Sequence, residues 1–202
     1  LLGKALYSVV EDSQRLEITT LLPLSLYIHN ENKERYRELL KGEYVVTNPS
    51  EYTKRFEVVE VNVCCEGFSS LITKPELLKE AIYLVEIGGV DLAGCFVNRT
   101  PVVTQSFTTE QGMNKFYKEL AKVLTSKLLE GFSDKDAELV YGKYETLTEE
   151  LKEIIDSFAK EYIQKNIYKK LADVGYKKLI HKLVLVGGGA IALERYLKED
   201  DN

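Results

Sequence analysis

The sequence is poor in residues that mark several classes of protein. It contains no tryptophan, one methionine, four prolines, two histidines and three cysteines among 202 residues. Cys64, Cys65 and Cys95 are odd in number and lack a metal-like spacing, so they favour a reducing cytoplasm over a secreted disulfide framework. Two histidines leave little room for a zinc site. No apolar run approaches the roughly 20 residues that span a bilayer, so we expect a cytoplasmic protein that does not cross a membrane.

A strongly basic surface is also missing. Lysine and arginine together number 27 and aspartate and glutamate 32, which gives a formal net charge of −5. Extended binding to nucleic acid needs a basic surface, so direct nucleic-acid binding is not expected. With 45% hydrophobic and 29% charged residues, the composition is that of a globular protein of one domain or two small ones.

Two kinds of apolar pattern alternate along the chain. Continuous or β-branched apolar runs predict strands, and apolar residues at helical spacing predict helices. The alternation indicates an α/β fold. Strands are expected within 16–28, including an extended piece at Leu26–Ile28, and at 44–46, 56–64, 81–87, 92–97, 102–103 and 179–186. Helices are expected at the start of the chain and at 30–40, 110–129, 146–174 and 191–197.

Several residues predict where these elements end. Thr146 with Glu149 fits a capping box at the start of the longest helix, and Gly131 is expected to end the helix before it. Asn48-Pro49-Ser50 predicts a turn between two strands. A change of pattern near residue 80, where the β-rich first part ends, predicts a domain boundary there.

Two glycine clusters stand at the ends of expected strands. Gly88-Gly89 follows the 81–87 strand, and Gly187-Gly188-Gly189 lies between a strand and a helix. Glycine lets the backbone approach a bulky ligand, and a helix N-terminus offers N–H groups to an anion. Neither cluster is a Walker A loop, because no Gly-Lys-Ser or Gly-Lys-Thr follows, and neither has the GxGxxG pattern. Two such turns can hold a nucleotide from two sides, or they can be tight turns without a ligand.

The order of the segments resembles that of the actin-like ATPases. Residues 183–190, LVLVGGGA, resemble their adenosine loop, and residues 81–94, AIYLVEIGGVDLAG, resemble their second phosphate loop. Residues 106–115, SFTTEQGMNK, resemble the turn and helix that approach the nucleotide. Residues 16–40 resemble the plasmid-segregation actins of the ParM type, and Val61–Gly67 resembles the family's strand with an acid at its end. The resemblance covers nearly the whole chain and implies an actin-like (RNase H-like) fold, with mixed sheets flanked by helices.

The resemblance implies a role for each matched residue. Glu66 takes the place of the catalytic residue that orients the attacking water, and Glu86 that of the acid that acts on Mg²⁺ through bound water. The residues implied in binding ATP are Gly88 and Gly89 at the phosphates, Gly112 and Lys115 near the ribose and base, and Gly187, Gly188, Gly189 and Ala190 against the adenosine. These roles suit phosphoryl transfer, which depends mostly on positioning and electrostatics.

The second phosphate loop departs from the family's pattern. Glu86 stands where the family has Asp, Val90 and Asp91 replace hydroxyl residues, and Ala93 stands where a later Asp is expected. Asp91 brings a carboxylate close to the phosphates, which is unfavourable unless Mg²⁺ bridges them. The family's first phosphate loop has no counterpart, and the chain does not open with Met. We therefore expect a fragment, inactive in hydrolysis by itself, with the remainder of the first actin-like domain at 1–80 and the second domain at 81–202.

The resemblance implies a protein that forms ATP-dependent filaments and separates plasmid copies through a DNA-binding adaptor. Such a protein self-associates and need not touch DNA itself. The charged run 30–37 is then either a solvated helix face or a subunit contact. A non-catalytic actin-fold scaffold that has lost turnover stays an alternative, which the altered 86–93 loop supports. A sugar-kinase or acetate-kinase relative of the same superfold is a third possibility, and Glu66 can also be a plain surface acid.

Overall fold

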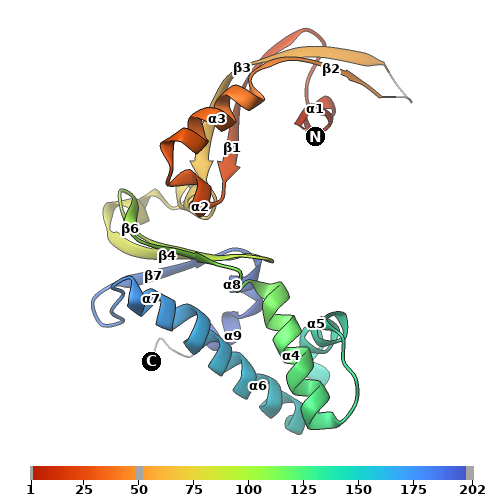
Figure 1. Ribbon diagram of the computed structural model, residues 1–202, viewed down its shortest axis with the longest axis vertical. Coiled ribbons are helices and arrows are strands. Elements are labelled where there is room, and N and C mark those ends of the chain that lie inside the picture. The colour runs from red at the N-terminus through yellow and green to blue at the C-terminus, as the bar shows by residue number, and fades with distance from the viewer. Residues whose placement is uncertain (1, 49–51, 199–202) are drawn as a thin grey trace. The chain divides into compact units, whose positions relative to one another are not determined.

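The computed structural model describes residues 2–48 and 52–198, which belong to two compact units, Leu1–Ser69 and Ser70–Asn202 (Figure 1). Each unit contains its own sheet. Residues 49 and 50 of the expected turn lie outside the described part of the chain. Two short 3₁₀ segments, Phe68–Thr73 and Pro75–Lys79, precede the first strand of the second unit. Of the helices described, none has the length and apolarity needed to cross a membrane.

The first unit is built on a three-stranded sheet with the order β1-β3-β2. β1 (Gln14–Leu22) runs parallel to β3 (Thr53–Cys65), and β2 (Gly42–Thr47) runs antiparallel to it. Alternate residues of β3 face a small core, because side chains alternate between the two faces of a strand. One buried cluster of this unit consists of Leu22, Val58, Val61 and Val63.

Three helices accompany this sheet: α1 (Leu2–Tyr7), α2 (Leu24–Tyr27) and α3 (Asn30–Leu40). The expectation of an extended segment at Leu26–Ile28 is wrong. The amides of Leu26 and Tyr27 both donate to the Pro23 carbonyl at 2.9 Å, and the turn that they close buries Leu24. Pro23 is the N-cap of α2, with φ −50° and ψ 144°, so the helix begins at the residue after it.

The second unit is built on a four-stranded sheet with the order β6-β5-β4-β7. β4 (Ala81–Ile87), β5 (Leu92–Asn98) and β6 (Thr100–Thr109) form an antiparallel meander, and β7 (Lys182–Val186) runs parallel to β4. The strand expected at 179–186 begins only at Lys182, because β4 offers pairing partners from Ile82 onward and Leu179 is fully exposed.

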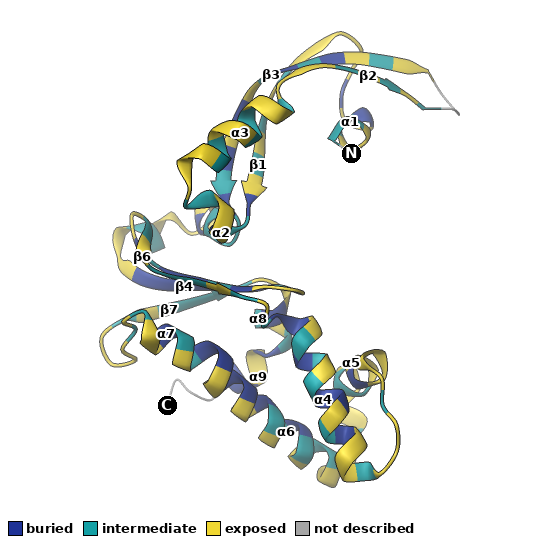
Figure 2. Cartoon of the chain, viewed as in Figure 1, coloured by how far each residue is buried: buried dark blue, intermediate teal, exposed yellow. Residues whose placement is uncertain are grey.

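Helices cover one face of this second sheet (Figure 1). They are α4 (Met113–Leu128), α5 (Asp134–Gly142), α6 (Glu149–Ile163), α7 (Lys169–Asp173), α8 (Gly188–Ala192) and α9 (Glu194–Lys198), with a 3₁₀ turn at Tyr144–Thr146. Their buried sides meet the sheet in one large core (Figure 2). Phe116 lies in this core within 5.5 Å, between ring centres, of Tyr117, Tyr141, Phe158 and Tyr162.

Several expected helix boundaries are wrong. The cap of α6 is Thr148, whose side chain accepts the Leu151 amide, whereas Thr146 donates its hydroxyl to the Lys143 carbonyl and ends the 3₁₀ turn. A π-helical turn at Gln164–Tyr168 separates α6 from α7. α5 was not anticipated, although its capping box at Ser133 and Asp136 is a sequence signal for a helix start.

The ends of α4 and of the last helix also differ from expectation. α4 begins at Met113 rather than residue 110, and Leu129, not Gly131, takes the left-handed conformation at its end, with φ 55°. The helix expected at 191–197 is divided at Leu193 into α8 and α9.

Candidate nucleotide site in the second unit

One edge of the second unit's sheet gathers the ends of four strands. β4 and β7 run parallel, and their paired residues Glu86 and Val186 lie side by side at this edge. The antiparallel strands complete it, because β5 begins at Leu92 and β6 ends at its partner Thr109. Ligands of α/β sheets bind beyond the carboxyl ends of parallel strands. Both predicted glycine turns follow those ends, so the fold brings them to the same edge.

The turn at 88–91 is fastened to the beginning of α4. Three amides at the start of α4, one from the N-cap Gly112 and two from its first residues, donate to carbonyl groups of the turn. Gly112 donates to Val90 at 2.9 Å, Met113 to Gly88 at 2.9 Å, and Asn114 to Gly89 at 2.7 Å. The Gly88 amide in turn donates to the Asp91 carbonyl at 2.9 Å. The turn therefore caps α4, and the amides that this helix end would offer to a phosphate are engaged. This capping is also the reason why α4 starts at Met113.

Among the predicted nucleotide-binding glycines, three are required by the packing of the chain itself. A Cβ on Gly112 would lie 2.6 Å from the backbone of the 88–91 turn. Gly187 has φ +92°, and a Cβ there would lie 2.6 Å from the Ile87 carbonyl oxygen. A Cβ on Gly189 would lie 2.3 Å from the Ile87 side chain. Gly188 differs, because a Cβ there would meet nothing within 4 Å, so this glycine borders space that a ligand could fill.

Tyr162 of α6 determines where the segment before α4 lies. Its hydroxyl donates to the Gln111 carbonyl at 2.9 Å, and the Gly112 carbonyl oxygen is 3.4 Å away. Burial raises the pKa of Tyr162, so the hydroxyl keeps its proton and remains a donor. A side chain from the core thus positions the glycine turn.

A pocket of about 400 Å³ is lined in part by Ile191 and Ala192 of α8, the helix that begins at Gly188. Its walls come from α4, α5, the α5–α6 connection, α8 and α9: Tyr117, Tyr141, Gly142, Tyr144, Glu145, Ile191, Ala192, Glu194 and Arg195. The volume lies in the range of small-molecule sites. Aromatic and aliphatic walls with a few charged groups suit a flat heterocycle with polar edges.

The Asp156 carboxylate of α6 supports one wall of this pocket. It accepts hydrogen bonds from the Tyr144 hydroxyl at 2.7 Å and from the Tyr196 hydroxyl at 2.8 Å. Burial, together with the bond to Asp156, raises the pKa of Tyr144 to about 12. Both hydroxyls therefore stay protonated at neutral pH, and the wall stays tied to α6.

Arg195 forms another part of the wall. Its guanidinium lies 3.6 Å from the centre of the Tyr144 ring and pairs with the Glu145 carboxylate. Across the pocket, the Tyr141 hydroxyl donates to the Ala192 carbonyl at 2.8 Å, which joins α5 to α8. These residues were not predicted from the sequence. The signal was the YGKY segment at 141–144, two tyrosines outside any clear periodic pattern.

The structure places the other predicted residues as follows. Glu86 is half-buried near the end of β4, and Ala190 donates its amide to the Gly187 carbonyl in the first turn of α8. Lys115 lies in the first turn of α4, and its ammonium is 3.5 Å from the carboxylate of Glu119 one turn later. Glu66 belongs to the first unit, directly after β3, where its amide donates to the Leu22 carbonyl at 2.9 Å. Its catalytic role stays a prediction.

The groups at the sheet edge fit a metal ion only in combination with phosphates. Across residues 2–48 and 52–198, no three or more His, Cys, Asp and Glu side chains gather to hold a metal ion. Magnesium at nucleotide sites needs only one or two carboxylates, with phosphates and water as the other ligands, and Glu86 and Asp91 flank the glycine turn. The buried Thr109 hydroxyl at the same edge has no hydrogen-bond partner in the described part of the chain. These groups are compatible with a magnesium nucleotide.

Comparison with known proteins assigns the fold. Residues 1–68 match the family described as actin like proteins N terminal domain. The chain matches Ta0583, an archaeal actin homologue, with a TM-score of 0.77 and 16% identity, over 98% of this chain and 65% of Ta0583. The chain has an actin-like fold. It also matches the psk41 ParM protein, with a TM-score of 0.73 and 16% identity over 98% of this chain and 60% of ParM. For the Alp12 filament structure, the TM-score is 0.68 and the identity 19%, over 98% of this chain and 65% of Alp12.

The actin-like fold confirms the predicted α/β class, with mixed sheets flanked by helices. The matched residues 1–68 nearly coincide with the first compact unit, Leu1–Ser69. No curated protein sequence matches the chain. The chain spans 65% of the length of Ta0583. A crystal structure of Ta0583 in complex with ADP and a structure of Bacillus thuringiensis ParM with ATP also match the chain.

Proposed function

We propose that this actin-like protein binds ATP with Mg²⁺ at the carboxyl edge of its second sheet and assembles with copies of itself into filaments. One observation carries the proposal: Ile191 and Ala192, which line the 400 Å³ pocket, sit on the same short helix as Gly188, the glycine that borders open space. A base in the pocket and phosphates at the glycine turns would occupy adjoining surfaces of one unit.

Each group at this edge then has a defined task. The rings of Tyr117, Tyr141 and Tyr144 and the aliphatic Ile191 would contact the base. Gly188 would approach the sugar and phosphates closely, and Glu86 would hold water in the shell of the metal. Bound Mg²⁺ supplies charge neutralisation at the phosphates. Glu66 would hold the attacking water, because a carboxylate accepts its protons.

Self-assembly is supported by the filament structure of the matched Alp12 and by the match to ParM. The finer role follows the same comparison: a cytoplasmic filament that separates plasmid copies, with a DNA-binding adaptor as its partner. The chain's formal charge of −5 suits a protein that leaves DNA contact to such an adaptor.

A second candidate is a non-catalytic actin-fold scaffold. One observation favours this candidate: the carbonyl groups of the 88–91 turn accept hydrogen bonds from the amides at the start of α4. In addition, the Gly88 amide donates to the Asp91 carbonyl within the turn. These hydrogen bonds stabilise the turn even when no phosphate is bound. This candidate keeps self-assembly and removes turnover.

Nucleotide binding is tested with a fluorescent ATP analogue and a matched pair of glycine variants of the protein at its full natural length. Gly188→Ala places a methyl group in open space, so the fold tolerates it and only a ligand meets it. We expect the Kd to rise about tenfold or more. The control is Gly131→Ala, also in open space but outside the pocket, which should leave the Kd unchanged. Equal binding by both variants contradicts the proposed site.

Turnover is tested by phosphate release and pelleting with ATP and Mg²⁺. If Glu66 orients water, Glu66→Ala filaments form but release little phosphate. Glu60→Ala, which changes an exposed acid on the strand that precedes Glu66, should behave as wild type. If the wild-type protein pellets without releasing phosphate, the scaffold is the better assignment.

A further inference from the structure

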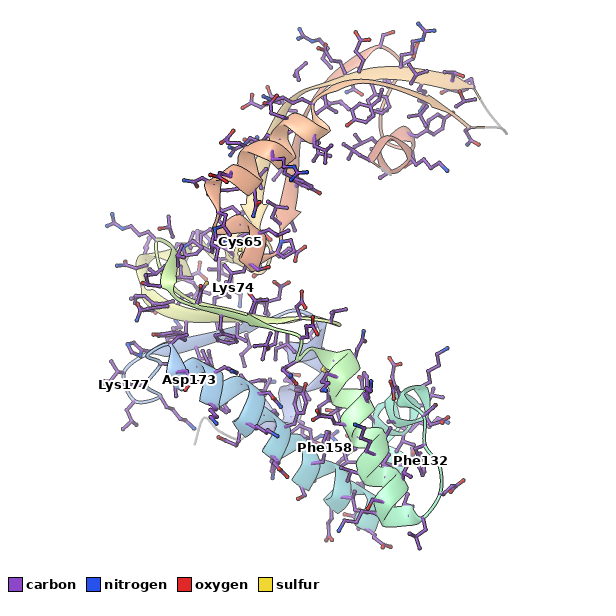
Figure 3. The ribbon with its side chains drawn as sticks, in the orientation of Figure 1. Cys65, Lys74, Phe132, Phe158, Asp173 and Lys177 are labelled. Atoms are coloured by element: carbon purple, nitrogen blue, oxygen red, sulfur yellow. The ribbon has the colours of Figure 1, made fainter. Side chains whose placement is uncertain are left out.

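The sheet of the first unit is hollowed near one end. A pocket of about 420 Å³ has walls from the region of each of its three strands: residues 13–15, 43–45 and 55–57. Its centre is the row of Gln14, Phe56 and Tyr44, which are partners in the sheet register. The hollow therefore lies toward the beginning of β3, away from Cys65, which Figure 3 labels at the end of this strand. The volume lies in the range of ligand sites.

The side chains that border the hollow stand on the face of the sheet opposite its core. Tyr44 packs against the buried cluster of the first unit, and its ring stacks on that of Phe56 with 5.4 Å between the ring centres. Side chains alternate along a strand, so Glu43, Val45 and Arg55 point to the other face. All three are exposed, and the exposed fraction of Val45 is 64%. The hollow is therefore open to a partner.

Two side chains of the hollow carry opposite charges that are not neutralised. Arg15 and Glu57, which are also wall residues, pair with each other at 3.0 Å. Among residues 2–48 and 52–198, neither the Glu43 carboxylate nor the Arg55 guanidinium makes an ion pair or a hydrogen bond. Val45 is the register partner of Arg55 and follows Glu43 on the same face. A ligand that complements this surface carries a base and an acid close together.

β2 is also an edge strand of its sheet, with β3 as its partner on one side. Its backbone groups on the other side form no hydrogen bond within the part of the chain that the structure describes. Edge strands are commonly protected by proline, by lysine or by a bulge. β2 contains neither of these residues, and it pairs with β3 without a register shift. An unprotected edge of this kind can accept a further strand.

Contacts on the core side hold β2 in position. The Tyr44 hydroxyl donates to the Leu40 carbonyl at 2.8 Å, which joins β2 to the end of α3. α1 lies close to the same strand, because a Cβ on Gly3 would be 2.8 Å from the Val46 side chain. The free edge is therefore ordered before a partner binds, and a preordered surface loses little entropy on binding.

We infer that the free edge of β2 accepts an extended segment of a partner protein as an additional strand. This segment carries an acidic and a basic side chain in alternate positions, on the face of the hollow. The base would pair with Glu43, and the acid would reach Arg55 across Val45. A second copy of this chain paired through β2 would not supply these charges, because β2 contains no basic residue. The site lies in the first unit and goes beyond the proposed nucleotide binding and assembly.

The test measures how fluorescent peptides bind to the protein at its full natural length, by fluorescence anisotropy. One peptide is Thr-Val-Glu-Val-Lys-Val-Thr, and two like-charged peptides replace its Lys by Glu or its Glu by Lys. We expect the Kd of the mixed-charge peptide to be about tenfold lower than that of either like-charged peptide. N-methylation of one alternate set of its amides should abolish binding, because only alternate amides of an added strand face β2.

Charge variants of the hollow should change which peptide binds best. Glu43→Lys leaves two cations at the site and should favour the acidic peptide. Arg55→Glu leaves two anions and should favour the basic peptide. The matched controls Glu31→Lys and Arg35→Glu make the same charge changes at exposed positions of α3, and both should keep the preference of the wild type.

Three results would overturn the inference. The first is equal binding of the three peptides, or charge variants that keep the wild-type preference. The second is binding that neither methylated set weakens, because the peptide is then not an added strand. The third is a dimer of the protein alone that Glu43→Lys disperses, because a second copy then occupies this edge. Nucleotide binding is measured separately with the ATP analogue, so these results leave the proposed function as it stands.

Discussion

The first unit buries mostly aliphatic side chains, several of them valines of β3, together with the rings of Tyr7 and Phe56. The second unit buries a cluster of aromatic rings between a sheet and several helices. Within the part of the chain that is described, the largest fully buried side chains, Tyr83 and Phe116 among them, all lie in the second unit. In the first unit α3 has no buried residue. Elements with few buried apolar side chains open most easily. The pocket and both glycine turns of the candidate site therefore belong to the unit with the larger core, which can fix the position of those turns.

The link between core and site is direct in the second unit. Tyr162 is a member of the core and bonds the backbone immediately before α4. Asp156 lies nearly two turns earlier on the same helix. Its carboxylate accepts hydrogen bonds from two tyrosines, of which Tyr144 lines the pocket. Damage to the core of this unit should therefore reach the nucleotide site, and damage to the first unit's core should not.

The largest expected effect comes from Phe116→Ala. It removes a ring packed against four other aromatic rings and should cost about 3–5 kcal/mol of the second unit's stability. Val58→Ala in the first unit removes two methyl groups and should cost about 1.5 kcal/mol. Hydrogen exchange read separately on each unit checks both values. Equal losses in the two units would contradict the comparison.

Asp156→Ala should have the next largest effect. Two tyrosine hydroxyls lose a charged acceptor, which should cost about 1.5–3 kcal/mol and loosen one wall of the pocket. Urea unfolding and the Kd for the fluorescent ATP analogue measure the two consequences. Tyr196→Phe serves as a control. It removes only the hydrogen bond from Tyr196, which does not line the pocket, and keeps the bond from Tyr144. A stability loss with an unchanged Kd would show that the wall does not contact the ligand.

Gly112→Ala separates structural glycine from ligand-facing glycine. Its Cβ would lie 2.6 Å from backbone atoms, so the 88–91 turn must move away from α4 at a cost of about 1–3 kcal/mol. Gly188→Ala should leave the melting temperature unchanged. Thermal unfolding of the two variants decides between them, and a destabilised Gly188→Ala protein would mean that this glycine is also required by packing.

The smallest expected effect is a response to alkaline pH. Burial raises the pKa of Tyr141, Tyr162 and Tyr196 well above the ordinary value of 10 and that of Tyr144 to about 12. Because the folded state favours the protonated form, this contribution to stability is complete below pH 10 and is lost as the pH rises through 12. Thermal unfolding at pH 8 and above pH 10 should show the loss in the second unit. Tyr144→Phe should reduce it, and an unchanged profile would argue against the role of this tyrosine.

Much of the fold was accessible from the sequence. Strands at 56–64 and 81–87 and the helix at 30–40 match β3, β4 and α3 closely, because β-branched runs and helical spacing are strong local signals. The predicted extended piece at Leu26–Ile28 failed because the decisive bonds run back to Pro23. The predicted cap at Thr146 was wrong because α6 begins later, and the Thr148 hydroxyl accepts the hydrogen bond from the Leu151 amide.

For the candidate site, local sequence patterns were enough to show which segments take part. The glycine clusters at 88–89 and 187–189 are visible as punctuation after strands, and their order along the chain was enough to suggest the actin-like fold. The separate roles of these glycines follow from tertiary contacts. Gly187 and Gly189 allow the backbone to approach Ile87, a residue about a hundred positions away, whereas Gly188 makes no such close approach. The walls of the pocket likewise depend on distant hydrogen bonds: the Tyr141 hydroxyl donates to the Ala192 carbonyl, and the Tyr144 hydroxyl donates to the Asp156 carboxylate. Contacts between residues so far apart in the chain leave no local pattern in a sequence.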